Sequence, residues 1–172
     1  MEPFLRYMLT SPSLTDWMQG PAGNWIWSLC ETFHFVGLCL LVGVVGIFDL
    51  RMLGVAKGLP LVVLKRLIPW GVLGFGLCLT TGLVFVEGVG ANLFGDNAYD
   101  VIARDVYLQL KLIFIFLAGV NLLAFYLTGT ARAVDALGPE DDAPKLAKLI
   151  AGTSLFLWIG VIIFGRLIPR GL

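Results

Sequence analysis

The sequence predicts an all-α integral membrane protein, a four-helix bundle with a short N-terminal interfacial helix and a single transmembrane domain over residues 1–172. The composition favours a membrane protein, because 58% of the residues are hydrophobic and only 14% are charged. Soluble domains are nearer ~45–50% apolar and ~25% charged. Four segments are also long and apolar enough to cross a hydrocarbon core of ~30 Å. Twelve basic residues balance twelve acidic ones, which excludes nucleic acid as a partner held on a broad basic surface.

The four predicted spans are helices, since none alternates with a period of two and lipid-exposed backbone must satisfy its own hydrogen bonds. They cover about residues 25–48, 67–86, 106–127 and 146–168. Trp25 and Trp27 open the first span and Trp70 lies near the start of the second, at the level that aromatic side chains prefer. Ahead of the spans, the amphipathic segment 4–9 predicts the short interfacial helix.

The basic residues predict the orientation. The loops that follow the first and third spans together hold seven Lys and Arg residues, and the opposite side holds four. The positive-inside rule then predicts a multi-pass protein of the inner (plasma) membrane with both termini on the periplasmic side. The lipid bilayer is therefore the first expected partner, and a larger membrane complex or a homo-oligomer is the second.

Three ionisable residues lie within the predicted spans, where each costs roughly 2.5–3.5 kcal/mol on insertion scales. They are Glu31, His34 and Lys111. At about 1.5 Å per residue, Glu31 and Lys111 both lie roughly 8–9 Å from the outer side. We expect them to form an ion pair, with His34 one turn deeper on the face of Glu31. Thr80 and Thr81 of the second span fall near the same level, so the sequence predicts a polar belt in the outer half of the bundle.

One face of the third span also points inward. Its residues recur at helical spacing and include the polar Lys111 and Asn121. The stripe consists of Tyr107, Lys111, Phe114, Ala118, Asn121 and Phe125. Two interpretations remain open: the buried polar groups form a functional site, or they only fix the register of the helices.

His34 is the sole histidine and offers several chemistries. A b-type haem would take it as an axial ligand, with Arg51 or Arg166 for the propionates, although the two arginines lie at opposite ends of the spans. The sequence holds no second histidine for the sixth position. A lipid-soluble quinone would instead accept hydrogen bonds from His34, Lys111 and Asn121.

Two metal interpretations are weaker. Glu31 and His34 form one E-x-x-H spacing of the di-iron type, without the second copy that such sites need. Cys30 and His34 lie one turn apart and suit a soft ion such as Cu(I). The three cysteines show no CxxC spacing and are odd in number, which argues against a disulfide framework or a structural zinc site.

Several short motifs carry a resemblance. His34 precedes a glycine-rich apolar run that ends in Phe48-Asp49-Leu50-Arg51-Met52-Leu53-Gly54. Further on stand Arg66-Leu67-Ile68-Pro69, Thr81-Gly82 and Leu108-Gln109-Leu110-Lys111-Leu112. Over about residues 25–130 the chain resembles an uncharacterised family of bacterial four-helix membrane proteins. More distantly it is similar to HemJ-type protoporphyrinogen oxidases and to the CopD-like membrane domain of copper resistance.

The HemJ-type resemblance implies a b-type haem, with important roles for the histidine at His34 and the lysine at Lys111, and it matches Arg51 to the arginine that closes the first helix. Where that family has a histidine late in the third helix, this chain has Asn121-Leu122-Leu123. We therefore expect a haem-associated redox or electron-transfer site formed by His34, Glu31, Lys111, Arg51, Thr81 and Asn121. The alternative is a non-catalytic accessory subunit, which would present a glycine face (Gly71, Gly74 and Gly82) to a partner.

Overall fold

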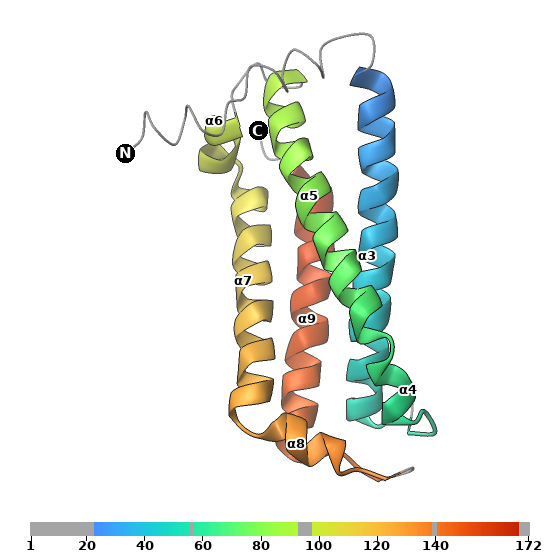
Figure 1. Cartoon of the computed structure of the whole chain (residues 1–172). Helices are drawn as coiled ribbons and strands as arrows, with labels where there is room; N and C mark the ends of the chain where they lie inside the picture. Colours follow the sequence, from blue (N-terminus) through green and yellow to red (C-terminus); the bar gives the residue numbers. More distant parts are fainter. Residues whose placement is uncertain (1–22, 56, 93–97, 139–140, 169–172) are drawn as a thin grey trace.

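The structure, a computed structural model, describes residues 23–55, 57–92, 98–138 and 141–168, and every regular element in these ranges is a helix (Figure 1). Four helices are long. They are α3 (Gly23–Leu53), α5 (Ile68–Asn92), α7 (Val106–Leu127) and α9 (Lys145–Leu167). Three short helices lie at the ends of the long ones: α4 (Leu61–Lys65), α6 (Ala98–Arg104) and α8 (Thr130–Asp135). The predicted all-α class is confirmed for these ranges, and the predicted interfacial helix falls outside them.

Within the described ranges, four segments are long and apolar enough to cross a membrane: Trp25–Leu53, Leu61–Glu87, Val106–Leu127 and Lys145–Leu167. The predicted third and fourth spans agree with α7 and α9 to within one residue. The first two predictions were too short, because α3 continues past residue 48 to Leu53 and α5 continues to Asn92. The helices extend because polar residues beyond an apolar window, such as Asp49 and Glu87, do not end a helix by themselves.

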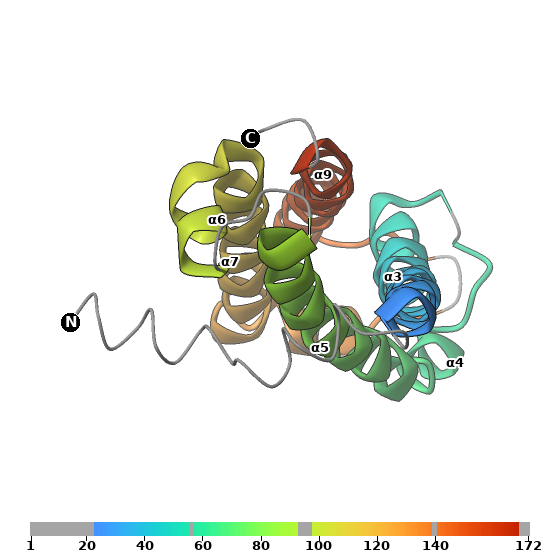
Figure 2. The ribbon, with the colours of Figure 1, turned by 90° about the horizontal axis from the view of Figure 1, so that it is seen from above.

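The long helices form two pairs. α3 packs mainly against α5, α7 packs mainly against α9, and α3 also contacts α9 (Figure 2). Large apolar side chains remain exposed along all four helices, for example Val72 at 66%, Phe116 at 70% and Leu149 at 67%. Such a surface is typical of a chain whose solvent is lipid.

The crossing of α3 and α5 is a close contact between two backbones. A Cβ atom on Gly37 would lie 2.8 Å from the carbonyl oxygen of Gly74, and one on Gly74 would lie 2.6 Å from the carbonyl oxygen of Gly37. Small residues permit this approach, which gives van der Waals contact that a larger side chain would prevent. Gly71 and Gly82 of the same α5 face lie against Val44 and His34. This glycine face, expected to meet a partner, packs on α3 of the same chain.

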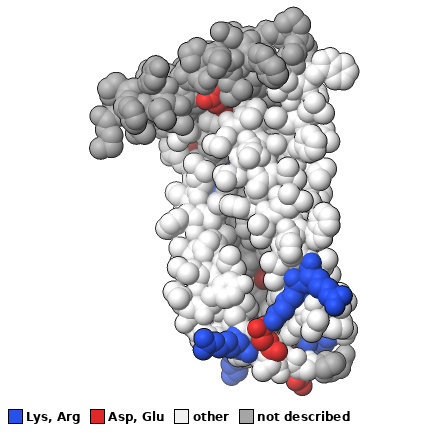
Figure 3. Space-filling view, in the orientation of Figure 1, with Lys and Arg blue, Asp and Glu red and all other residues white. Residues whose placement is uncertain are grey.

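On the face that Figure 3 shows, Lys and Arg side chains gather at the end of the helices where α4 and α8 lie, below a broad and mostly uncharged belt. An apolar cluster closes the bundle at this end. It comprises Met52, Leu61, Leu64, Val134, Ala143, Ala147 and Ala151. α3 begins and α9 ends at the opposite end (Figure 1).

Candidate functional site

His34 and Thr81 join α3 to α5 by a hydrogen bond. The Nδ1 atom of His34 lies 2.8 Å from the Oγ1 atom of Thr81. The Thr81 hydroxyl has one hydrogen and donates it to the carbonyl oxygen of Leu77 at 2.5 Å. The hydroxyl must therefore accept from His34, which places the imidazole proton on Nδ1. Nε2 is then left with its lone pair, the form in which imidazole binds a metal or accepts a proton.

Cys78 and Lys111 complete the surroundings of His34. The thiol of Cys78 donates a long hydrogen bond to the backbone carbonyl of His34, with 3.5 Å between Sγ and O. Lys111 comes from α7, and its charge acts on both His34 and Cys78. A Cβ on Gly165 of α9 would lie 3.4 Å from the Nζ atom of Lys111, so the lysine stem lies along a helix that leaves room for it. All four long helices thus contribute to one site.

Aromatic rings cover the histidine toward the end of the bundle where α3 begins. The centroid of Phe85 lies 5.1 Å from that of His34, and Trp27 lies 5.0 Å from Phe85. A Cβ on Gly82 would lie 3.9 Å from Cε1 of His34, so the glycine keeps one side of the imidazole uncrowded. The imidazole is therefore held in an apolar setting with one fixed polar contact.

Glu31 takes no part in this group. Its side chain is exposed, and among the described residues no ion pair joins it to Lys111. Three residues turn a helix by about 300°, so Glu31 is displaced by about 60° around α3 from His34. That rotation is enough to move the carboxylate from the interior to the surface of a helix that contacts its neighbours along a narrow strip. The expected Glu31–Lys111 pair is not formed.

The inward stripe of α7 faces α9. Phe114 packs against Gly160 and lies 5.0 Å from the Phe164 ring, between ring centroids. Asn121 donates from Nδ2 to the carbonyl oxygen of Ile150 at 3.0 Å. Asn121 is ten residues from Lys111, about 15 Å along the helix. It therefore ties α7 to α9 below the His34 group. The inward direction of the stripe was predicted correctly, but its two polar residues, Lys111 and Asn121, take part in separate contacts.

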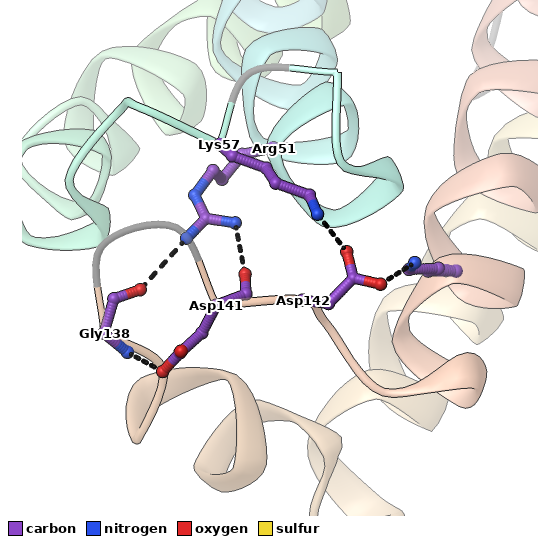
Figure 4. Close-up of polar contacts among 6 residues, drawn as sticks. Arg51, Lys57, Gly138, Asp141 and Asp142 are labelled. Atoms are coloured by element: carbon purple, nitrogen blue, oxygen red, sulfur yellow. Dashed lines mark hydrogen bonds and ion pairs between the residues drawn. The ribbon is translucent and has the colours of Figure 1, made fainter.

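Arg51 lies still farther away. It is 17 residues after His34, about 25 Å along α3, and it is 2% exposed. Its guanidinium donates from Nε to the carbonyl oxygen of Leu59 at 3.1 Å. It also donates to the carbonyl oxygens of Asp141 and Gly138, both at 3.3 Å (Figure 4). These carbonyls belong to the connections that follow α3 and α8. Arg51 closes the basic end of the bundle and does not face His34.

An ion-pair cluster lies beside the Arg51 clamp, the three hydrogen bonds from Arg51 to backbone carbonyls. The carboxylate of Asp142 lies 2.7 Å from the Nζ atom of Lys148 and 2.8 Å from that of Lys57 (Figure 4). Hydrogen bonds from Lys148 and Lys57 lower the pKa of Asp142 from 3.8 to about 2. The pairs are exposed to water, so each contributes little to stability on its own.

Two further residues with polar contacts in the structure, Cys78 and Asp49, were not predicted to have a role. Cys78 was read only as part of an apolar run, although its thiol contacts the backbone carbonyl of His34. Asp49 fell just outside the predicted first span, whereas the structure buries it in α3 at 9% exposure. Its signal in the sequence is an acidic residue between Phe48 and Leu50 with no helix-breaking residue nearby.

The described residues contain no group of three His, Cys, Asp or Glu side chains that could hold a metal ion. A di-iron site has no further ligands in these ranges. No family model, no curated protein and no solved structure matches the chain.

Proposed function

We propose that the chain is an integral membrane four-helix bundle that binds a b-type haem through Nε2 of His34 and serves membrane redox chemistry or electron transfer. The observation that carries this proposal is the hydrogen bond from Nδ1 of His34 to the Thr81 hydroxyl. Because Nδ1 holds the proton, the lone pair of Nε2 is available to bind iron. Metal-binding histidines commonly donate their other ring nitrogen in this way, which fixes the ring and its tautomer.

The surrounding residues suit such a group. The apolar rings beside His34 favour a flat, apolar cofactor, and Gly82 places no side chain against the imidazole. Lys111 supplies a positive charge that would balance a propionate carboxylate, a role that Arg51 is too distant to fill. When bound, haem supplies a centre that takes up and releases single electrons.

The basic end of the bundle is proposed to face the cytoplasm, because cytoplasmic loops carry the excess of Lys and Arg. The His34 group then lies in the periplasmic half of the membrane. An electron donor or acceptor would be a second membrane protein or a small molecule that reaches this half.

The test is an absorption spectrum of the detergent-purified protein made with ample haem, oxidised and then reduced with dithionite. A Soret band is expected in the wild type and not in His34→Ala. Thr81→Val keeps the side-chain volume but removes the acceptor, so it should weaken haem binding about 10–100-fold. Asn121→Ala is the matched control, because it removes an inward polar group of the same bundle away from His34 and should keep the band.

A featureless wild-type spectrum would overturn the haem proposal and favour the accessory subunit. The predicted glycine face could not then be the partner surface, since Gly71 and Gly74 pack on α3. A partner helix would instead meet the outward glycines Gly43, Gly46 and Gly76, which have no atom within 4 Å of an added Cβ. Loss of a co-purifying membrane protein in Gly76→Leu would support that alternative.

A further inference from the structure

Asp49 is a buried acidic residue that the His34 site does not use. It lies on α3 about 22 Å along the helix from His34, and 9% of it is exposed. Its carboxyl group is hydrogen-bonded to the side chain of Ser154 on α9. The second oxygen, Oδ2, is buried and has no hydrogen-bond partner in the structure. The interface of α3 and α9 therefore contains a carboxyl group that is only half satisfied.

No cation balances Asp49 among the described residues. The nearest basic residue along the chain is Arg51, whose guanidinium is turned toward the carbonyls of Leu59, Gly138 and Asp141. Three lysines at this end, Lys57, Lys65 and Lys148, pair with other carboxylates, those of Asp135 and Asp142. From α9, the group that faces Asp49 is the uncharged Ser154.

An ionised carboxylate in this position would leave a charged oxygen without a donor in a low-dielectric setting, which costs far more than burying the neutral acid. The neutral acid keeps one oxygen as an acceptor for Ser154 and carries its proton on the other. Its position one turn before the end of α3 places it near water on the basic side, from which a proton can arrive.

We propose that Asp49 is a proton-binding site between α3 and α9: its carboxyl group holds a proton at neutral pH and exchanges it with water at the basic end of the bundle. The ligand is a proton, taken up by a carboxylate oxygen to give the acid and released to water again. This proposal does not depend on the haem proposal, since it concerns other residues at the other end of the bundle.

Infrared difference spectroscopy of the full-length protein tests it, because a carboxylic acid and a carboxylate have separate carbonyl bands. The difference between wild type and Asp49→Asn at neutral pH should contain the band of a protonated carboxyl group. Asp142→Asn is the matched control. The pKa of Asp142 is about 2, so its difference spectrum should contain carboxylate bands only.

Two further measurements make the result decisive. Ser154→Ala should shift the frequency of the Asp49 acid band, because the band reports the hydrogen bond that the variant removes. Transfer into heavy water should shift the same band, because an exchanging proton is replaced by deuterium. Carboxylate bands without any acid band in the difference spectrum of Asp49→Asn would overturn the proposal, and so would an acid band that heavy water leaves unchanged. Asparagine resembles the neutral acid in shape, so Asp49→Asn is expected to fold.

Discussion

Replacement of Arg51 by alanine is expected to destabilise the bundle and to leave the His34 site intact. The variant removes three hydrogen bonds from a charged donor to the carbonyls of Leu59, Gly138 and Asp141. All three are longer than the usual 2.9–3.0 Å, so about 1 kcal/mol each is a fair value. The loss is then about 3 kcal/mol, because the buried guanidinium of Arg51 supplies all three hydrogen bonds.

For a chain of this size, about 3 kcal/mol corresponds to a fall in Tm of about 6–12 °C. Arg51→Lys should restore only part of it, since an ammonium group is compact and does not reach carbonyls of two loops as a planar guanidinium does. Arg132→Ala, at an exposed residue of α8, is the control and should change Tm little.

The assay is thermal unfolding in detergent, followed by the fluorescence of the five tryptophans. The Soret band is recorded on the same samples. A Tm of Arg51→Ala equal to that of the wild type would refute the clamp. Full rescue by lysine would refute the argument from guanidinium geometry. Loss of the Soret band with an unchanged Tm would show instead that Arg51 serves the cofactor.

Three further predictions concern backbone and charge. Gly54 ends α3 at φ +86°, so Gly54→Ala should cost about 1–2 kcal/mol and lower Tm by at least about 2 °C. Gly74→Leu should force α3 from α5 and abolish a monodisperse, folded preparation, whereas Gly76→Leu, where an added Cβ has no atom within 4 Å, should not. Because the pKa of Asp142 is lowered from 3.8 to about 2, its contribution to stability is present above pH 3.8 and is lost as the pH falls toward 2. The Tm difference between wild type and Asp142→Asn should therefore shrink over that interval, and a constant difference would contradict this assignment.

Span positions were predictable because they depend on a sum over many residues. An apolar window of about 20 residues identifies a membrane span whatever the order of residues within it. The ends are less predictable, since Asp49 and Glu87 interrupt the apolar window without interrupting the hydrogen bonds of the helix. Gly54 marks the true end of α3. Its positive φ allows Val55 N–H to bond the Leu50 carbonyl at 3.0 Å and Gly54 N–H to bond the Arg51 carbonyl at 3.2 Å.

The composition of the site was only partly predictable, because a helix that is apolar on every side does not reveal which side faces inward. On α7 the spacing of Lys111, Phe114, Ala118 and Asn121 did reveal it, since the polar residues fall on one stripe. On α3 no such stripe exists, and Glu31 was assigned to the face of His34 on a spacing that leaves them about 60° apart.

The α3–α5 crossing determines how α3 is rotated about its own axis. This crossing depends on two residues that carry no polar side chain. Gly37 and Gly74 allow the backbones to touch, and this contact places the next turn of α3 beside the next turns of α5. His34 then meets Thr81 and Cys78, whereas Glu31 is carried outward. A side chain at either glycine would push α3 and α5 apart. The hydrogen bond between His34 and Thr81 would then break, although neither of these two residues is changed. The contacts of His34 therefore depend on the packing of two glycines. The positions of the polar residues in the sequence do not predict these contacts unless that packing is known.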